Sequence, residues 1–377
     1  MHDPGGEGAA ATIDPEPLAP MSGTGRSLGL DVFRGLVIAW LLVLVHVPTT
    51  GWRGHAAWFG WGNSDVFFPA FLFVAGAGLG FQTRWKPMPW ARLVRRFVTL
   101  VVLGLFVNAW TAGGADLTML RIPGVLQRIA LVGLAGAAVA VAVRRRWQAA
   151  LVVALALALA WAVALQVSAR DCVDGLPQPD GCGTLLAVDT AVFGEQHVYH
   201  QGRLGHDPEG LASTVGALAT FVVGYGAAML VQSLRARTVS IRAGALLAVA
   251  AGWLVVLPLL LWFQPVAKRL WTGSFVAMNA AWCLALLAAL VFAFDRDRHR
   301  AVELLTWPLV ALGRNALVIW TAIFLQQPVL ARTTVDGRRL GEWFVAEHGA
   351  AAYLAVFGGG WLVIAMLMHA ARWHVRL

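Results

Sequence analysis

Ten long apolar stretches constrain the fold of this chain more than any other feature. A helix needs about 20 mostly apolar residues to cross the hydrocarbon core of a bilayer. The stretches lie near 30–48, 64–82, 94–111, 122–143, 147–168, 209–232, 243–263, 274–294, 304–325 and 350–370. A mean hydropathy of +0.68 and a charged fraction of 13% exclude a water-soluble globule. Because the stretches are continuous and do not alternate as in membrane β-barrels, we predict an all-α, polytopic transmembrane helix bundle of about ten spans.

Arginine and lysine residues gather in every second loop between these stretches. Short cytoplasmic loops retain such charges, so we predict that both termini are cytoplasmic. The clusters are Arg84, Lys86, Arg92, Arg95 and Arg96; Arg144 to Arg146; Arg235, Arg237 and Arg242; Arg296, Arg298 and Arg300; and Arg372 with Arg376. Because the net charge of +9 is spread over these loops and not gathered in one domain, we expect contact with membrane lipid and no binding of nucleic acid.

The first 26 residues differ in composition from the rest of the chain. They are rich in Gly, Ala and Pro and contain no apolar run, which is typical of disorder and unlike a cleaved signal peptide. We therefore predict a disordered cytoplasmic tail at 1–26 and one transmembrane domain at 27–377.

His55 lies just outside the end of the first apolar stretch and shortly before the second. A neutral imidazole at this boundary can take a proton from an amine or a hydroxyl near pH 7. Asp65 opens the second stretch, where its carboxylate could orient the imidazole. His46 lies near the outer end of the first stretch, and it could share a cavity with His55 or be a structural histidine. We predict a catalytic site at the outer rim made of His55, Asp65 and His46.

Four polar residues lie within apolar stretches near the predicted cytoplasmic side. Asp31 and Arg34 are three residues apart, so they can share a helix face as an ion pair, and a structural and a functional role are both open. Arg314 and Asn315 open the ninth stretch, where the arginine could bind a phosphate or reach the lipid headgroups. A charge inside a span is costly unless it faces the bundle interior and finds a partner, so these four residues are candidates for a buried polar site.

The segment RIPGVLQR at 121–128 places polar groups at the outer end of the fourth stretch. Pro123 suits the first turn of a helix, where its missing N–H does no harm. Gln127 and Arg128 fall about one turn inside the boundary, a position that is costly against lipid. We expect them to face a water-filled cavity and, with Arg121, to bind substrate.

Cys172 and Cys182 share the longest predicted outside loop, about 169–208. A local disulfide between them fits an oxidising compartment, and two unpaired thiols are the alternative. The histidines of this loop, at 197, 200 and 206, are loosely spaced and have no thiolate pair near them. We therefore expect no metal site.

Several short segments occur in a distinctive order. They are GLDVFRGL at 29–36, HAAW followed by DVFFPAFLFVAG at 55–76, RIPGVLQRIAL at 121–131, PEGLASTVGALAT at 208–220, KRLWTGSFV at 268–276 and PLVALGRNAL at 308–317. In these segments the chain resembles the heparan-α-glucosaminide N-acetyltransferase catalytic-domain family of bacterial and lysosomal transmembrane acetyltransferases. The resemblance runs from about residue 28 to the C-terminus.

The resemblance implies that 27–377 is an acyltransferase domain in a bacterial inner (plasma) membrane. It implies transfer of an acetyl group from cytosolic acetyl-CoA to the amino group of a glucosamine-type sugar at the outer face. His55 matches the catalytic histidine of the family, and Lys268 and Trp271 are expected to bind substrate. The residues expected at the acetyl-CoA site are Asp31, Arg34, Arg314 and Asn315. We favour direct transfer over an acetyl-histidine intermediate.

The chain departs from the family at His46, where the family has an Asn. An imidazole of suitable tautomer could donate the same hydrogen bond to an acetyl group. Two other functions stay open: an O-acyltransferase of cell-envelope polysaccharide, and a transporter of a small polar solute, which should carry inverted repeats that we do not find. The spacing of Gly76 and Gly80 allows close helix packing, either within the chain or in a homodimer.

Overall fold

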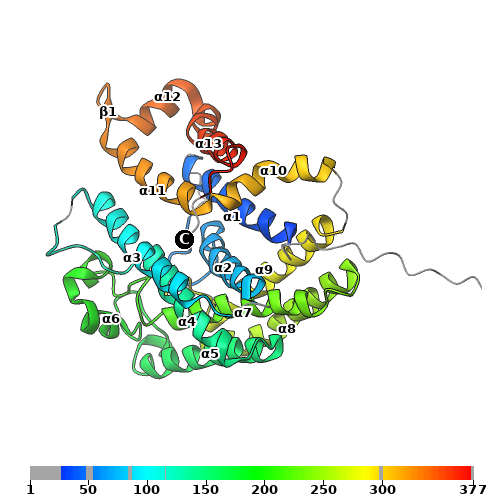
Figure 1. The fold of residues 1–377 in the computed structure, drawn as a ribbon. Helices are drawn as coiled ribbons and strands as arrows, with labels where there is room; N and C mark the ends of the chain where they lie inside the picture. The colour runs from blue at the N-terminus through cyan, green and yellow to red at the C-terminus, as the bar shows by residue number, and fades with distance from the viewer. Residues whose placement is uncertain (1–26, 48–53, 84–86, 115, 297–299, 375–377) are drawn as a thin grey trace, which may run out of the picture.

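The computed structural model of the protein describes residues 27–47, 54–83, 87–114, 116–296 and 300–374. The long helices are α1 (Leu28–His46), α2 (Phe67–Thr83), α3 (Trp90–Ala112), α4 (Val125–Ala142), α5 (Trp147–Ser168), α7 (Thr214–Ser233), α8 (Val239–Phe263) and α9 (Gly273–Phe294) (Figure 1). The chain continues with α10 (Arg300–Arg314), α11 (Ala316–Arg332), the strands β1 (Thr334–Val335) and β2 (Arg338–Arg339), α12 (Leu340–Tyr353), a π-helical turn (Leu354–Gly358) and α13 (Gly359–Ala370). The predicted all-α transmembrane bundle is confirmed, whereas the predicted tail at 1–26 lies outside the described residues.

The number of spans depends on how one bent helix pair is counted. Within the described ranges, nine helical segments are long and apolar enough to cross a membrane, and the pair α10–α11 gives ten if it forms one span. The sequence predicted a continuous ninth span at 304–325, and this prediction is wrong, because the two helices meet at an angle of 66°. The side chain of Asn315 donates hydrogen bonds to the carbonyls of Ala311 and Ala365, at 3.0 and 3.4 Å. Such side-chain bonds compete with the helical backbone.

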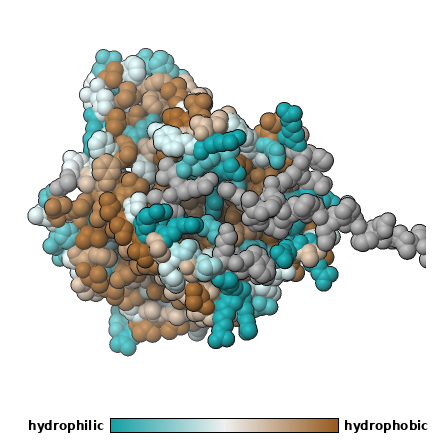
Figure 2. All heavy atoms as spheres, viewed as in Figure 1, coloured by the Kyte–Doolittle hydropathy of each residue, from teal (hydrophilic) through white to brown (hydrophobic). Residues whose placement is uncertain are grey.

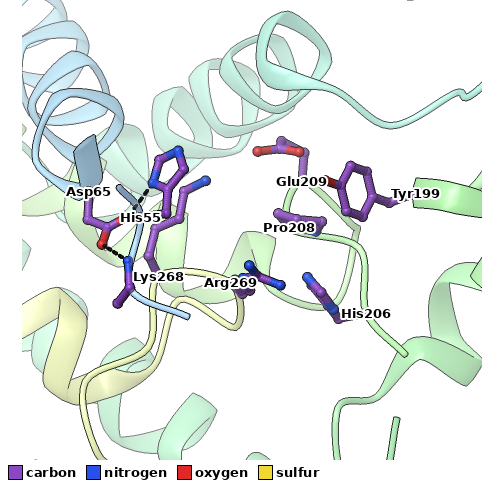
Figure 3. A pocket seen from close by; sticks show the side chains of 9 residues that line it. His55, Asp65, Tyr199, His206, Pro208, Glu209, Lys268 and Arg269 are labelled. Carbon is purple, nitrogen blue, oxygen red and sulfur yellow. Dashed lines mark hydrogen bonds and ion pairs between the residues drawn. The ribbon is translucent and has the colours of Figure 1, made fainter. Parts of the chain in front are cut away.

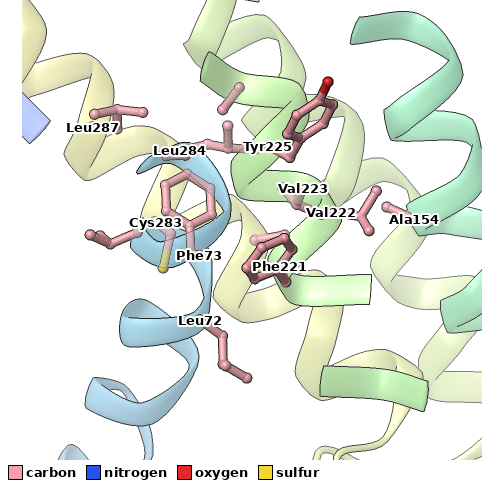
Figure 4. Close-up of a cluster of buried hydrophobic side chains, with 14 of the residues drawn as sticks. Leu72, Phe73, Ala154, Phe221, Val222, Val223, Tyr225, Cys283, Leu284 and Leu287 are labelled. Carbon is pink, nitrogen blue, oxygen red and sulfur yellow. The ribbon is translucent and has the colours of Figure 1, made fainter. Parts of the chain in front are cut away.

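Helix α7 is the centre of the bundle. Almost all of its residues are buried, and it packs against α2, α4, α5 and α9. Figure 4 shows Phe221 and Tyr225 of α7 among apolar side chains from these neighbours, including Phe73 of α2 and Leu284 of α9. A helix that is buried on nearly every face fixes the positions of the helices around it. It also gives the loop that leads into α7 a fixed end point.

The small residues of α2 pack within the chain. A Cβ added to Gly76 would lie 1.9 Å from the carbonyl oxygen of Phe221, and one added to Gly80 would lie 2.7 Å from Cβ of Ala228. Both partners belong to α7, so this spacing serves the α2–α7 contact. These two glycines therefore give no support to a homodimer, which stays a prediction.

One flank of the bundle is suited to contact with lipid. On α3 the side chains of Val94, Val98, Val102, Phe106 and Trp110 are exposed and lie four residues apart. Residues at that spacing share one helix face. Figure 2 shows apolar side chains covering the flank formed by α3 and α5. An apolar stripe of this length is expected to face hydrocarbon and not water.

The loop between α5 and α7 folds over one end of the bundle. It contains the short helix α6 (Leu186–Phe193). The structure joins Cys172 and Cys182 in a disulfide, as predicted, and they are not two unpaired thiols. Trp58, from the segment between α1 and α2, donates a hydrogen bond of 2.9 Å from its indole to the carbonyl of Pro177. The disulfide-closed turn thereby supports the segment that carries His55.

Candidate active site

A cavity of about 150 Å³ lies where this loop meets the starts of α2 and α7. Its lining comes from three separate parts of the chain: the segment before α2, the loop before α7 and the turn between α8 and α9 (Figure 3). The lining residues are His55, Ala56, Asp65, Tyr199, His206, Pro208, Glu209, Lys268 and Arg269. We call this cavity the His55 pocket. Most of its walls are polar, which is unusual in a bundle of this composition.

His55 and Asp65 form a directed pair in the His55 pocket. Nδ1 of His55 lies 2.5 Å from Oδ1 of Asp65. A carboxylate can only accept hydrogen bonds, so Nδ1 carries the hydrogen and Nε2 keeps a free lone pair. The His55 side chain is 43% exposed and that of Asp65 is fully buried. The structure therefore brings together the first two of the predicted catalytic residues, with the basic nitrogen available to a ligand.

Backbone hydrogen bonds hold the carboxylate of Asp65 in place. Its Oδ2 accepts from the N–H of Gly62 at 2.8 Å and from the N–H of Ala56 at 3.2 Å. The Gly62 bond closes a short 3₁₀ turn, Asn63–Asp65, immediately before α2. Asp65 is thus fixed by the start of a helix and by the residue that follows His55. This geometry ties the orientation of the imidazole to the backbone of both segments.

The opposite wall of the pocket is an ion-pair cluster centred on Arg121. The guanidinium pairs with Asp207 and, at 2.8 Å, with Glu209. Its carbon also lies 4.7 Å from the centre of the Tyr199 ring. Burial raises the pKa of the Glu209 carboxyl, but the charges of Arg121, Lys268 and Arg128 outweigh it and lower the pKa to about 2. Burial lowers the pKa of Arg121, but the two carboxylates outweigh it and raise the pKa. Arg121 does not line the pocket itself, but it fixes the loop residues that do.

Arg128 and Asp189 bind the end of the loop that leads into α7. Arg128 is 1% exposed and donates hydrogen bonds to the carbonyl of Gly210 and the hydroxyl of Ser213. Asp189 accepts from the backbone N–H groups of Leu211 and Ala212, and burial raises its pKa to about 6. Arg128 does not line the His55 pocket, and its guanidinium lies 6.0 Å and 5.2 Å from the ring centres of Phe68 and Trp271. The expectation that it faces a water-filled cavity stays a prediction.

Gln127 is half-buried, its amide group is enclosed, and it does not line the His55 pocket. Its amide lies beside Gly104 of α3 and Gly124, and neither amide atom has a hydrogen-bond partner in the part of the chain that the structure describes. The structure therefore places it at the α3–α4 contact, and its predicted role in substrate binding gains no support from position.

The turn between α8 and α9 separates two residues that the sequence grouped together. Lys268 lines the pocket, whereas Trp271 is fully buried and donates a hydrogen bond of 3.1 Å to the hydroxyl of Thr220 in α7. Trp271 adopts a left-handed backbone conformation, with φ of 53°, and its ring lies 5.2 Å from the guanidinium of Arg128. Trp271 anchors the turn, and Lys268 and Arg269 extend from that turn into the cavity.

Several pocket residues were not predicted from the sequence. Tyr199, Glu209 and Arg269 were not singled out, and His206 was considered only as a metal ligand. The segment PEGL, which contains Glu209, and the arginine next to Lys268 were the available signals. Within the described ranges no group of three or more His, Cys, Asp and Glu side chains could hold a metal ion. The expectation of no metal remains a prediction.

His46 lies outside the lining of the His55 pocket. It is fully buried at the end of α1, where Nδ1 lies 2.9 Å from the carbonyl of Leu42 and Nε2 lies 3.3 Å from Oε1 of Gln326 in α11. Its ring packs 5.9 Å from that of Tyr353. The structure therefore does not bring His46 and His55 into one cavity, and it assigns His46 to the contact between α1, α11 and the C-terminal helices.

The four residues expected at a nucleotide site gather where α1 begins. Arg34 lies 3.8 Å from Asp31, and a Cβ on Gly313 would lie 2.5 Å from the carbonyl oxygen of Asp31, so the end of α10 packs on the start of α1. Arg314 and Asn315 lie at the α10–α11 break and do not open a span as predicted. Beside them is a cavity of about 450 Å³, the Arg314 pocket, which is lined by Trp307, Arg314, His369, Ala370, Arg372 and His374.

Two mammalian proteins are similar to this chain. The human protein named heparan-alpha-glucosaminide N-acetyltransferase is 21% identical over an alignment that covers 72% of this chain and 49% of the human protein. The mouse protein of the same name is 22% identical, with coverage of 75% and 52%. The chain thus spans about half the length of the curated relatives it matches, and no family model matches it. These identities support a distant relationship to proteins named N-acetyltransferases.

Proposed function

We propose that this protein transfers an acetyl group from acetyl-CoA to the amino group of a glucosamine-type sugar, and that the transfer takes place in the His55 pocket. The observation that carries the proposal is the 2.5 Å contact between His55 Nδ1 and Asp65. It leaves Nε2 as a base that faces a cavity, the arrangement that general-base catalysis requires. The distant relationship to proteins named N-acetyltransferases supports the choice of reaction.

The reaction that this pair would perform is direct acyl transfer. The amine of the acceptor attacks the thioester carbonyl, so that an N–C bond forms and the C–S bond breaks. Nε2 of His55 takes the proton from the nitrogen and returns it to the CoA sulfur as the thiolate leaves. The buried carboxylate of Asp65 stabilises the imidazolium between these two steps, as the third group does in a catalytic triad.

The tetrahedral intermediate needs a donor for its oxyanion, and His46 is not among the residues that line the pocket. Lys268 lines the pocket, and Figure 3 shows its ammonium pointing toward the side where the His55 ring lies. A charged donor in a site shielded from water stabilises a developing oxyanion strongly. Our proposal gives this role to Lys268.

The donor would enter from the opposite end of the bundle. The phosphates of CoA cannot cross hydrocarbon, so the proposal places them at the Arg314 pocket, where Arg314 and Arg372 contribute positive charge. The pantetheine arm would then extend through the bundle toward His55. The arginine-rich loops agree with a cytoplasmic location for this end, and the His55 pocket would face the outer side.

The decisive experiment measures acetyl transfer from radiolabelled acetyl-CoA to glucosamine by the purified protein, with His55→Ala beside the wild type. We expect an N-acetylated product in the wild type and a loss of about 10²–10⁴-fold in the variant. Product bearing an O-acetyl group would favour the O-acyltransferase alternative, because the same base can activate a hydroxyl. Equal activity of the wild type and His55→Ala would overturn the proposed mechanism.

A further inference from the structure

Arg269 is a cation without a counter-ion in the His55 pocket. It is half-buried and lines the cavity, and its guanidinium has no hydrogen bond or ion pair to any residue that the structure describes. Arg121, behind the opposite wall of the pocket, contrasts with it, because two carboxylates already pair with its guanidinium. A planar guanidinium that is partly withdrawn from water and unpaired is suited to bind a carboxylate or phosphate through two parallel hydrogen bonds.

His206 presents a second unused polar atom to the same cavity. Its side chain is 2% exposed, and its ring packs 5.2 Å from that of Trp58 and 5.8 Å from that of Tyr199. Nδ1 lies 2.6 Å from the carbonyl of Leu204, so Nδ1 carries the hydrogen and Nε2 is an acceptor in the neutral ring. Nε2 is buried and has no partner among the described residues.

The surroundings of His206 favour its neutral form. Burial lowers its pKa most, and the nearby charge of Arg269 lowers it further, while the Leu204 hydrogen bond and the carboxylates of Asp207 and Glu209 act in the opposite direction. A neutral Nε2 accepts a hydrogen bond from a hydroxyl group. A buried acceptor without a partner is unfavourable, and a hydroxyl of a bound ligand would remove that cost.

These two groups lie apart from the catalytic pair. Figure 3 shows the His55 and Asp65 side chains together on one side of the cavity, His206 on the other side and Arg269 between them along the lower edge. A ligand whose amine reaches His55 would therefore extend toward Arg269 and His206. The charge of Lys268, which points to the His55 side, remains available for the reacting carbonyl.

We propose that Arg269 and His206 form a subsite for an anionic group, a carboxylate or a phosphate ester, and for a neighbouring hydroxyl on the acceptor. The inference rests on the proposed function, because it assumes that the His55 pocket binds the acceptor. Arg269 holds the anionic group, and Nε2 of His206 accepts from the hydroxyl. The preferred acceptor is then an acidic amino sugar, and an uncharged ring substituent gives a poorer substrate.

Kinetics with three acceptors test this inference. They are glucosamine, glucosamine 6-phosphate and muramic acid, which carries a carboxylate, each with radiolabelled acetyl-CoA and the purified full-length protein. We expect kcat/KM for at least one acidic acceptor to exceed that for glucosamine by about tenfold or more, mainly through KM, since a charge-assisted hydrogen bond is worth a tenfold change or more in affinity. The acceptor that gains most distinguishes a phosphate from a carboxylate.

Three variants test whether Arg269 carries the preference for an acidic acceptor. Arg269→Gln should lower the ratio of kcat/KM for the acidic acceptor to that for glucosamine by about tenfold, and Arg269→Lys should restore part of it. Arg203→Gln is the matched control, because Arg203 is an exposed arginine of the loop that carries His206, and its guanidinium donates hydrogen bonds to its neighbours His200 and Gln201. That variant should keep the ratio of the wild type.

Calorimetric binding of glucosamine 6-phosphate and muramic acid separates this inference from the proposed function. Binding that depends on Arg269, without transfer to any acceptor, would retain the subsite and reject the transfer reaction. Transfer to glucosamine with equal kcat/KM for the acidic acceptors would reject the subsite and retain the reaction. An acidic preference that survives in Arg269→Gln would also overturn the inference, because the anionic group would then be bound elsewhere.

Discussion

Asp65 accepts hydrogen bonds from the imidazole of His55 and from the backbone N–H of Ala56, the residue that follows His55. The carboxylate lies 2.5 Å from Nδ1 of His55 and 3.2 Å from the nitrogen of Ala56. One buried group therefore sets both the rotation of the ring and the path of its backbone. Since a fixed tautomer is what makes Nε2 basic, the orientation and the chemistry of His55 depend on the same carboxylate.

Replacing Asp65 by Asn tests this dependence. The amide can present its NH₂ group to Nδ1, which would move the hydrogen of the neutral ring to Nε2 and remove the base. We expect kcat to fall by about 10²–10⁴-fold with a small change in KM for acetyl-CoA. Steady-state kinetics over a range of pH would measure this, with the exposed Asp116→Asn as the control. Wild-type kcat in Asp65→Asn would show that the pair has no catalytic role.

Arg121 should contribute strongly to stability, because it is the counter-ion of two buried carboxylates. The side chains of Asp207 and Glu209 are 0% and 9% exposed. Arg121→Gln would remove the ion-pair partner of both carboxylates, at a cost of about 3–5 kcal/mol. Thermal unfolding of the purified protein should show a clear loss in Tm. The control is Arg170→Gln, whose ion pair with Asp171 is exposed, and for which we expect little change. Equal Tm values for the two variants would refute the claim that Arg121 stabilises the fold as the counter-ion of these carboxylates.

The same ion pair predicts how stability depends on pH. The pKa of Glu209 falls from 4.5 to about 2 on folding, so the folded state binds fewer protons than the unfolded state between these values. Its contribution to stability is therefore full above about pH 4.5 and is lost as the pH falls toward about 2. In Arg121→Gln this acid-dependent part should be much smaller, and thermal unfolding between pH 3 and 6 would measure the difference.

The sequence predicted the parts of this protein that depend on local information. The positions of the first eight spans follow from apolar length alone, and the helices agree with them to within about five residues, whereas the ninth is broken and the last begins about ten residues earlier than predicted. His55 and Asp65 were paired correctly because both flank the same short connection. The break at Asn315 was missed, because hydropathy does not report that an amide side chain will take the carbonyls of Ala311 and Ala365.

The remaining errors concern the side of a helix from which a side chain projects and the contacts between residues that are distant in the sequence. His46 is near the predicted depth, but it faces Gln326 of α11, and depth in a membrane does not determine which neighbour a side chain meets. Trp271 and Lys268 are three residues apart, yet the left-handed backbone at Trp271 sends the indole into the core. Tyr199, His206 and Glu209 reach the pocket through the long loop, whose course no local pattern predicts.

His46→Asn separates a structural role from the catalytic role that the sequence suggested. An amide of similar size loses one of the two ring contacts, to Leu42 or to Gln326, so we expect a lower Tm, from a loss of about 1 kcal/mol. The kcat of the protein that remains folded should stay within about twofold of the wild type, because His46 lies outside the lining of the His55 pocket. A fall in kcat comparable to that of His55→Ala, at unchanged Tm, would return His46 to the reaction.

Arg314→Gln tests whether the donor and the acceptor use opposite ends of the bundle. The Arg314 pocket and the His55 pocket have no lining residue in common, so a substitution in one should leave the ligand of the other undisturbed. We expect KM for acetyl-CoA to rise by about tenfold, as for the loss of one charge-assisted hydrogen bond to a phosphate, while KM for the amino sugar changes little. Inhibition by CoA should weaken in parallel, but inhibition by dephospho-CoA should weaken less if Arg314 contacts the 3′-phosphate. An increase in KM for the sugar instead, with acetyl-CoA unaffected, would show that the donor enters elsewhere and would leave the His55 mechanism intact.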